Sequence, residues 1–198
     1  MIKAIVLAAG LSSRMEAKNK LLLPFRGKAI LQHTIDALLA TQVERIIVVT
    51  GHEQEKVTSL LENVEVSITH NEAYQQGQLT SIQKGLEQLS DNCTAFMVCL
   101  SDMPLIEAKA YDELIQTYQL AIIDQPIVLP HNGKRAGNPK LFHLDYKEQI
   151  LALDAAEHQG AKAVLKRNFD KIIAHQTEND AFFMDIDTPA AYQALLKR

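Results

Sequence analysis

Short apolar runs rich in β-branched residues alternate along the chain with longer segments of helical periodicity. The runs predict strands, and the segments whose apolar residues recur every three or four positions predict helices. Up to Gln119 the expected elements are the strand Ile2–Ala8, the helix Ala29–Ala40, the strand Arg45–Thr50, the helix Glu53–Leu61, the strand Val64–His70, a helix from about Leu79 to Leu89, the strand Ala95–Leu100 and a helix from about Ala108. This alternation is typical of βαβ units, whose parallel sheet is covered by helices on both faces.

The pattern becomes less regular after Pro126. The expected elements there are a strand Ile127–Leu129, a turn-rich segment His131–Pro139, a short strand Lys140–His143, short helices near 147–153 and 160–167, the apolar runs Lys171–His175 and Ala181–Ile186, and a helix after Pro189. No linker, repeat or charge block divides the chain. We therefore expect one three-layer α/β/α domain over residues 1–198, Rossmann-like and mostly parallel, whose ligands bind at the carboxyl ends of the strands.

Composition and charge narrow the class of protein. The 198 residues are 47% hydrophobic and 22% charged, which is typical of a globular protein and excludes disordered and collagen-like chains. Lys+Arg 20 against Asp+Glu 24 gives a net charge of -4, so we expect no nucleic acid partner. No apolar run approaches the roughly 18 residues that span a bilayer, so we expect no membrane partner. The two cysteines, Cys93 and Cys99, lie in one apolar stretch and are expected to be reduced core thiols in the cytoplasm.

The first strand leads into a loop of small residues followed by cations. Residues 7–14 read LAAGLSSR, and Lys20 follows six residues later. Small residues allow backbone amides to approach a ligand closely, and Arg14 and Lys20 are suited to a polyphosphate. The loop matches neither GxxxxGK[ST] nor GxGxxG, which argues against an ordinary P-loop or dinucleotide site. The alternative is a plain turn with solvated cations.

Carboxylates follow two of the expected strands. Asp102 is the second residue after the fourth strand, Asp185 lies near the end of the apolar run Ala181–Ile186, and Asp187 follows that run. Strand alternation would place Asp185 and Asp187 on one face, from which either could reach Asp102 if the strands are neighbours. One or two carboxylates at such a position suit Mg²⁺, which completes its octahedron with phosphate oxygens and water. The alternative is that Asp102 and Asp187 are helix caps.

Two segments with glycine complete the candidate chemistry. Gly77 precedes a helix with Ser81 in its first turn, where free amides favour the oxygens of a ligand. Residues 135–139 read RAGNP, a turn with one cation that by itself is usually only a loop. The seven histidines have no spacing typical of zinc ligands, so a zinc site has little support.

Taken in order, these segments resemble the nucleotidyltransferase family that includes the molybdenum cofactor cytidylyltransferases and guanylyltransferases. The matching segments span nearly the whole chain: LAAGLSSRM (7–15), KLLLPFRGKAIL (20–31), VVTG (48–51), NEAYQQGQLTSIQKG (71–85), SDMP (101–104), RAGNP (135–139), GAKAVL (160–165) and DIDTPAAY (185–192). The chain looks closest to the cytidylyltransferases, because Ala9 replaces the first glycine of the LAGG of typical guanylyltransferases and because RAGNP and DIDTP are present.

The resemblance implies a fold of the nucleotide-diphospho-sugar transferase type and a role for each segment. Leu7, Ala8, Ala9 and Gly10 would read the base, Gly77 and Ser81 would hold the nucleoside, Arg14 and Lys20 the phosphates, Asp102 and Asp187 the Mg²⁺, and the turn with Arg135, Gly137 and Asn138 would line the acceptor side. The implied catalytic residues are Arg14, Lys20 and Asp102. The usual RMGxxK is here RMEAKNK, in which Glu16 replaces the glycine and one residue is inserted; Lys20 keeps its register with Leu21, and Lys18 is the alternative.

The implied reaction is transfer of CMP from CTP to the terminal phosphate of molybdopterin, with Mg²⁺ as cofactor and a molybdoenzyme as the recipient of the product. Positioning and charge stabilisation would supply most of the rate, without a protein nucleophile. Two alternatives remain open. One is a related transferase that uses GTP or a phosphosugar or phosphoalditol acceptor, and the other is a non-catalytic maturation factor that passes on the cofactor.

Overall fold

The computed structural model describes residues 1–15, 18–90, 92–154 and 161–198. Its strands are β1 (Ile2–Ala8), β2 (Pro24–Phe25), β3 (Lys28–Ala29), β4 (Arg45–Thr50), β5 (Ser67–His70), β6 (Ala95–Leu100), β7 (Ile127–His131), β8 (Lys140–His143) and β9 (Ile172–Gln176). Its α-helices are α1 (Ile30–Leu39), α2 (Gln54–Ser59), α3 (Gln78–Leu86), α4 (Ala108–Gln119), α5 (Tyr146–Leu151), α6 (Lys162–Arg167) and α7 (Pro189–Leu195). Short 3₁₀ helices are η1 (Lys20–Leu22), η2 (Tyr74–Gln76), η4 (Phe169–Lys171) and η5 (Asp180–Phe183).

Seven of the strands form one sheet in the order β5-β4-β1-β6-β8-β7-β9. The pairs β5–β4, β4–β1, β1–β6 and β7–β9 are parallel, and β8 is antiparallel to both of its neighbours. The mostly parallel sheet flanked by helices confirms the expected α/β fold class. The first half of the chain therefore forms the parallel βαβ units that its periodicity predicts.

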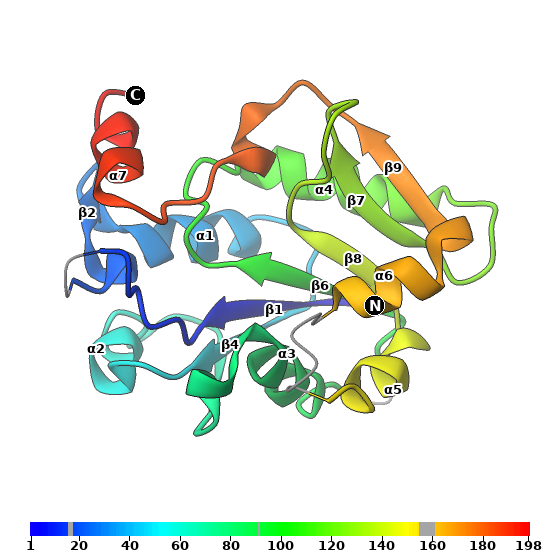
Figure 1. The fold of residues 1–198 in the computed structure, drawn as a ribbon, viewed down its shortest axis with the longest axis horizontal. Coiled ribbons are helices and arrows are strands. Elements are labelled where there is room, and N and C mark those ends of the chain that lie inside the picture. Colours follow the sequence, from blue (N-terminus) through cyan, green and yellow to red (C-terminus); the bar gives the residue numbers. More distant parts are fainter. Residues whose placement is uncertain (16–17, 91, 155–160) are drawn as a thin grey trace.

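Helices cover the two faces of this sheet. Even-numbered residues of β1, such as Val6, belong to a buried cluster with residues of α1, α2 and α4. Odd-numbered residues, such as Ile5, belong to a second cluster with residues of α3, α5 and α6. Figure 1 shows α1 and α4 on one side of the central strands and α3 and α5 on the other. Strand alternation thus divides the core into two layers, with the sheet between them.

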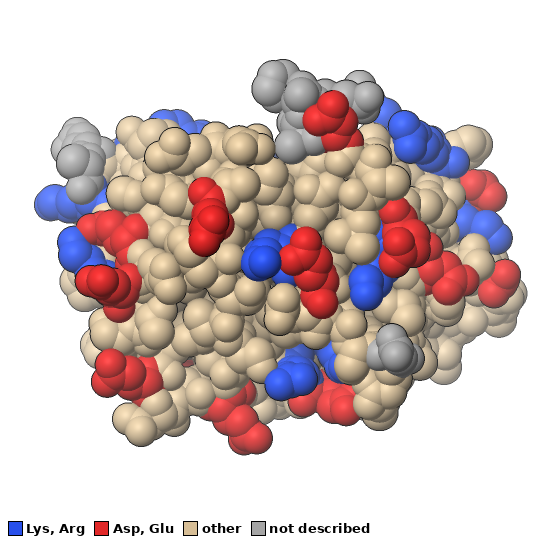
Figure 2. Space-filling model, turned by 90° about the horizontal axis from the view of Figure 1, so that it is seen from below, with Lys and Arg blue, Asp and Glu red and all other residues tan. Residues whose placement is uncertain are grey.

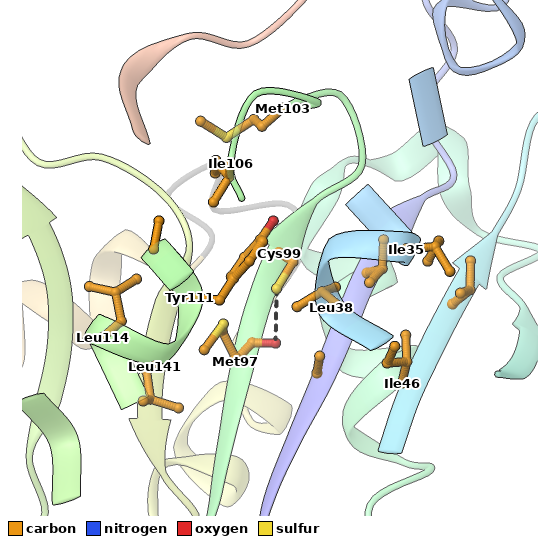
Figure 3. Packing of buried hydrophobic residues seen from close by; sticks show 14 of the residues in the cluster. Ile35, Leu38, Ile46, Met97, Cys99, Met103, Ile106, Tyr111, Leu114 and Leu141 are labelled. Carbon is orange, nitrogen blue, oxygen red and sulfur yellow. Dashed lines mark hydrogen bonds between the residues drawn. The ribbon is translucent and has the colours of Figure 1, made fainter. Parts of the chain in front are cut away.

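The first cluster extends under the loop that follows β6. Figure 3 shows Met97 and Cys99 of β6 between α1 and α4, and Met103 and Ile106 of the loop above Tyr111. Met103 and Ile106 are almost completely buried. Because these two side chains anchor the loop in the core, Asp102 between β6 and Met103 is held in a defined position.

The structure differs from the expected elements mainly in the last third of the chain. The run Ala181–Ile186 is not a strand, because the carboxamide of Asn179 accepts a hydrogen bond from the Ala181 amide and starts η5. The strand expected at Val64–His70 is shorter, as β5 begins at Ser67. The other expected helices and strands are present with ends shifted by up to three residues, although the helix expected from 160 begins outside the described residues.

The distribution of surface charge and the burial of the two thiols agree with what the composition predicts. On the face shown in Figure 2, acidic and basic side chains are interspersed rather than gathered by sign. Cys93 and Cys99 are both buried and unpaired, as expected for core thiols. In the described part of the chain, none of the helices has the length and apolar character needed to cross a bilayer.

Candidate active site

The candidate site lies where the neighbouring parallel strands β1 and β6 end. The hydroxyl of Ser101, the first residue after β6, donates to the carbonyl oxygen of Leu7 at 2.6 Å and so joins the two strand ends. The segment before α7 passes these ends (Figure 1), and its Ile186 amide donates to the Asp102 carbonyl at 3.0 Å. Three segments far apart in the sequence therefore meet at one edge of the sheet.

A network of ion pairs occupies this meeting point. The Nζ atom of Lys20 contacts Oδ2 of Asp102 and lies 2.5 Å from Oδ1 of Asp187. The guanidinium of Arg14 donates to the other oxygen of Asp187 at 2.7 Å. The side chains of Lys20 and Asp102 are 14% and 10% exposed, whereas that of Arg14 is 67% exposed. The network thus has the largely buried pair Lys20–Asp102 at its base and the exposed Arg14 at its rim.

Local sequence places Lys20 at this point. The Asn19 side chain accepts a hydrogen bond from the Leu21 amide at 3.1 Å, which starts η1 at Lys20. The Lys20 amide donates to the Ser12 hydroxyl at 3.2 Å, and Leu21 is buried in the first core cluster. The residue one position before the buried leucine is therefore turned toward the carboxylates, whereas Lys18 is exposed.

The two helix-cap alternatives for the carboxylates do not apply. The helix α7 is capped by Thr188, whose hydroxyl accepts from the Ala191 amide at 3.2 Å. The helix α4 begins only at Ala108, after Glu107, so Asp102 does not cap it. Both aspartates are consequently available to a ligand.

Burial and the two cations shift the ionisation of the cluster in different directions. Burial raises the pKa of Asp102, and the adjacent Lys20 ammonium offsets part of this effect. Burial acts to lower the pKa of Lys20, but the charges of Asp102 and Asp187 outweigh it and raise that pKa. Partial burial opposes ionisation of Asp187, but the hydrogen bond from Lys20 and the charges of Lys20 and Arg14 hold its pKa below the usual value. The ion pairs therefore favour the charged forms of Lys20 and Asp187, whereas burial disfavours the charged form of Asp102.

The carboxylates also fit a divalent cation. Asp102, Asp185 and Asp187 each offer an oxygen, and these atoms all lie within 4.8 Å of one another. The Oδ1 atom of Asp102 is buried and has no hydrogen-bond partner among the residues that the structure describes. A buried carboxylate oxygen without a partner is costly unless a cation or another donor binds it. Hard oxygen ligands of this kind suit Mg²⁺ or Mn²⁺.

A cleft of about 520 Å³ opens in front of the cluster. It is lined by Leu7, Ala9, Gly10, Leu11, Ser12, Ser13, Arg14, Lys20, Leu21, Tyr74, Gln75, Gly77, Gln78, Ser81, Leu100, Ser101, Asp102, Asp185 and Asp187. Gly77 has φ +114, which favours glycine, and it directly precedes α3. Buried Asn71 donates to the Ser81 hydroxyl at 2.9 Å. The amino end of α3 and a positioned hydroxyl therefore face the cleft opposite the carboxylates.

The close packing around Gly51 supports the loop that follows β1. A Cβ atom at Gly51 would lie 2.7 Å from the Tyr74 Cβ atom and 2.8 Å from the backbone oxygen of Ala9. Since the backbone of Ala9 cannot yield without moving the loop, any side chain at position 51 displaces the wall of the cleft. Gly51 therefore acts by close approach rather than by an unusual backbone angle.

We expect Gly51→Ala to lower the free energy of unfolding by about 1–3 kcal/mol, the usual cost of forcing an extra methyl group into a packed site. Urea unfolding followed by circular dichroism measures this change. Gly10→Ala is the matched control, because nothing lies within 4 Å of a Cβ atom there. Equal stability of the two variants would contradict the importance of the close approach.

The structure gathers most of the sequence-predicted site residues into this one cleft. Leu7, Ala9, Gly10, Arg14, Lys20, Gly77, Ser81, Asp102 and Asp187 all line it. Ala8 is buried in the first core cluster instead. Glu16 lies outside the described residues.

The residues predicted for the acceptor side separate into two groups. The exposed Arg135 donates to the Phe183 carbonyl at 2.9 Å and stacks on the Phe183 ring, and Gly137 packs against the same segment. Asn138 is the member of this turn that lines a cavity, one adjacent to the cleft. Arg135 and Gly137 thus shape the turn, whereas Asn138 lines the adjacent cavity.

Sequence reasoning missed several residues of the site. Asn71 directly follows β5, a position that marks a strand end as Asp102 does, and Ser101 belongs to the same SDMP segment. The resemblance implies only Asp102 and Asp187 as metal ligands, whereas the structure also brings Asp185 to the cluster. The common signal is a polar residue at the carboxyl end of a strand or beside one already identified.

Comparison with known proteins shows the family and the fold. The sequence model of the MobA-like NTP transferase domain matches residues 4–196. The chain is 31% identical over 164 residues to the "Bifunctional protein GlmU" of Bacillus cytotoxicus, covering 81% of this chain and 34% of that protein. The chain thus spans about a third of the length of this curated relative.

Solved structures share the fold at low sequence identity. A nucleotidyl transferase from Methanothermobacter thermautotrophicus superposes with a TM-score of 0.85 at 20% identity, covering 100% of this chain and 96% of that chain. Rv0371c of Mycobacterium tuberculosis in complex with manganese superposes with a TM-score of 0.77 at 21% identity, covering 99% and 98%. The fold is therefore that of nucleotide-diphospho-sugar transferases.

Proposed function

Because the chain belongs to the family of MobA-like NTP transferase domains, we propose that it transfers a nucleotidyl group from a nucleoside triphosphate to a phosphate-bearing acceptor. In its specific form, the proposal is transfer of CMP from CTP to the terminal phosphate of a molybdopterin-type acceptor, with release of pyrophosphate. One observation carries it: Lys20 lies between the carboxylates of Asp102 and Asp187 in the same cleft as the small-residue loop after β1.

The chain supplies separate surfaces for each part of the nucleotide. The loop of Leu7, Ala9 and Gly10 would hold the base, and Gly77 with Ser81 at the amino end of α3 would hold the ribose. Arg14 and Lys20 are ion-paired with the carboxylates, so a triphosphate would compete for these cations. The exposed Arg14 can turn toward the phosphates, while the half-buried Lys20 would contact them from beside the two carboxylates.

The aspartates would hold the divalent cation, with Asp102 and Asp187 as ligands and Asp185 as a third candidate. When bound, Mg²⁺ would neutralise charge on the phosphates and on the leaving pyrophosphate. An acceptor phosphate oxygen would attack the α-phosphorus of CTP, forming one phosphorus–oxygen bond while the bond to the β-phosphate oxygen breaks. Lys20 and Arg14 stabilise the charge that develops, and no side chain needs to form a covalent intermediate.

The choice of CTP is supported by Ala9. Ala9 lines the cleft, and its methyl group packs next to Gly51. Alanine at this position, where typical guanylyltransferases carry a glycine, favours CTP over GTP in this proposal. We place the enzyme in the cytoplasm, where its two unpaired cysteines stay reduced, with a molybdoenzyme as the recipient of its product.

Thermal unfolding with CTP, GTP, ATP or UTP, with and without Mg²⁺, tests the donor. At 100 times Kd a ligand stabilises by about 2.7 kcal/mol, which raises Tm by about 5–10 °C for a chain of this length. We expect this shift with CTP and Mg²⁺ and a smaller one with the other nucleotides. The largest shift with GTP would reassign the donor, and no shift with any nucleotide would contradict the proposal.

Pyrophosphate release then tests the acceptor. We expect turnover with CTP, Mg²⁺ and a molybdopterin-type acceptor, and background release with phosphosugars and phosphoalditols. Faster release with a phosphosugar or phosphoalditol would replace the acceptor in the proposal. Tight binding of molybdopterin without any release would instead support the maturation-factor alternative.

A further inference from the structure

A second cavity of about 220 Å³ adjoins the cleft. It is lined by Gln78, Ile82, Val98, Leu100, Asn138, Lys140, Phe142, Ala161, Lys162 and Leu165. Gln78 and Leu100 line both spaces, so the two are neighbours across the amino end of α3 and the carboxyl end of β6. Most of its wall is apolar, and its charged residues are two lysines.

The two lysines have no acidic partner in the part of the chain that the structure describes. Lys140 lies on β8 opposite Val98 of β6, and its Nζ atom donates to the Asn138 carboxamide oxygen at 2.6 Å. Lys162 is the first residue of α6 and is exposed. No described carboxylate forms an ion pair with either lysine. Counting the described residues alone, the cavity therefore presents positive charge without a paired acid beside an apolar wall.

The surroundings of Lys140 disfavour its charged form. Burial of its side chain and, to a smaller extent, the positive charge of Lys162 lower the pKa of Lys140 to about 8. Asn138, which resemblance alone assigns to the acceptor side, accepts from Lys140 and directs it. An oxyanion between the two lysines would offset the repulsion between their charges and would accept charge-assisted hydrogen bonds from them.

We propose that this cavity is the acceptor subsite, in which Lys140 and Lys162 bind an oxyanion of the acceptor while its apolar or aromatic body lies against Ile82 and Phe142. The proposal rests on the proposed function, which it extends to the class of acceptor. Asn138 is then a positioning residue, and Lys140 and Lys162 determine specificity.

The position of the cavity relative to the carboxylates supports this assignment. Val98 and Leu100 of β6 face the cavity, and Asp102 follows two residues later. Leu100 and Gln78 also line the cleft that contains Asp102. A molecule bound in the cavity can therefore reach into the cleft past these two residues.

Another pocket next to the cleft fits an anion less well. It shares Tyr74 with the cleft and is lined by Glu53, Glu55 and Lys56, among others. Two carboxylates there repel a phosphate-bearing acceptor. Of these two neighbouring spaces, charge complementarity favours the one with Lys140 and Lys162.

Binding of 1-naphthyl phosphate to the full chain, measured by calorimetry, tests the subsite. This probe carries an aromatic body and one phosphate monoester, and saturating CMP, which has no pyrophosphate to release, keeps it out of the nucleotide cleft without reacting with it. We expect Lys140→Gln and Lys162→Gln each to weaken binding about ten-fold, the usual effect of losing one hydrogen bond to a charged group. The double variant should lose about 100-fold, whereas binding of the neutral 1-naphthol should be equal in all variants.

The matched control is the double variant Lys134→Gln, Lys197→Gln, which removes the same charge from two exposed lysines that line neither space. It should bind 1-naphthyl phosphate like the parent. The proposal is overturned if the Lys140, Lys162 double variant binds the probe as tightly as the parent, or if the control pair weakens binding equally.

The pH dependence separates an anion-binding lysine from a merely structural one. Lys140 loses its proton as the pH rises through about 8. The phosphate monoester, whose second pKa is about 6, stays a dianion over this range. The Kd of 1-naphthyl phosphate should therefore rise between pH 7 and pH 9 in the parent and stay flatter in Lys140→Arg. A parallel rise in both proteins would contradict the role of Lys140.

Turnover distinguishes a failure of the subsite from a failure of the proposed function. With a molybdopterin-type acceptor, the Lys140, Lys162 double variant should raise the acceptor KM about 100-fold with an unchanged Tm shift from CTP. Normal turnover with an unchanged acceptor KM would refute the subsite alone. If no acceptor supports pyrophosphate release in the parent, the proposed function fails, and the binding of 1-naphthyl phosphate still decides whether the cavity is an anion site.

Discussion

Replacing Asp102 with asparagine is expected to reduce kcat for pyrophosphate release by about 10²–10³-fold, the usual effect of losing one preorganised charged group. Asparagine keeps the shape of the side chain but loses its charge. The variant therefore lacks one carboxylate ligand of the cation site, and Lys20 loses one of its two ion-pair partners. Because Lys20 keeps its ion pair with Asp187, and because the variant removes a buried charge whose Oδ1 has no partner among the described residues, it should keep the stability of the parent within about 1 kcal/mol.

Steady-state pyrophosphate release at saturating CTP and Mg²⁺ measures this effect, and urea unfolding checks the fold. Asp36→Asn is the matched control. Asp36 forms an exposed ion pair with Lys28, so this variant should leave kcat within about two-fold of the parent value. Binding of Mn²⁺, followed by electron paramagnetic resonance, should weaken in Asp102→Asn only. Activity of Asp102→Asn within a few-fold of the parent would remove Asp102 from the catalytic residues.

Replacing Lys20 with methionine is expected to reduce kcat/KM for CTP by a similar factor of about 10²–10³. It should also destabilise the protein at pH 7 by about 1–3 kcal/mol, because Asp102 is left buried without its cation. Without Lys20, burial would raise the pKa of Asp102 further. For an acid whose folded-state pKa is raised, stability is present at low pH and is lost as the pH rises through that pKa. The loss in Lys20→Met should therefore be smaller at pH 5 than at pH 7.

Two further variants make the Lys20 prediction falsifiable. The double variant Lys20→Met, Asp102→Asn should recover most of the stability at pH 7 but none of the activity, because it removes the unpaired charge without restoring the cation. Lys18→Gln should leave kcat/KM within a few-fold, since Lys18 is exposed outside the carboxylate cluster. A large loss in Lys18→Gln with a small one in Lys20→Met would assign the phosphate role to Lys18 instead.

The regular part of the fold follows from local sequence pattern. The strands β1, β4 and β6 have the bounds that their apolar runs predict, because a strand buried on both faces is a continuous apolar segment. The end of the chain does not follow the same rule. The run Ala181–Ile186 is apolar enough for a strand, but the side chain of Asn179 starts a 3₁₀ turn, and one hydrogen bond decides between the two conformations.

The candidate site was predictable where its residues stand at strand ends. Asp102 follows β6, and the loop of Ala9 and Gly10 follows β1, so parallel strand order brings them to one edge. The choice between Lys18 and Lys20 needed the register with Leu21, which the buried position of Leu21 explains. The possibility that Asp102 and Asp187 are helix caps could be excluded only from the observed starts of α4 and α7.

The sequence by itself determined the alternation of strands and helices, the small-residue loop with its cations, and the carboxylates that follow apolar runs. These features depend on periodicity and on residue type, which are local. Only the tertiary structure decided that Lys20 lies between Asp102 and Asp187, which are 85 residues apart in the chain, and that Lys140 and Lys162 share a cavity whose described lining residues include no acid. Such contacts depend on the order of strands in the sheet and on the packing of side chains between distant segments, and no local pattern records either.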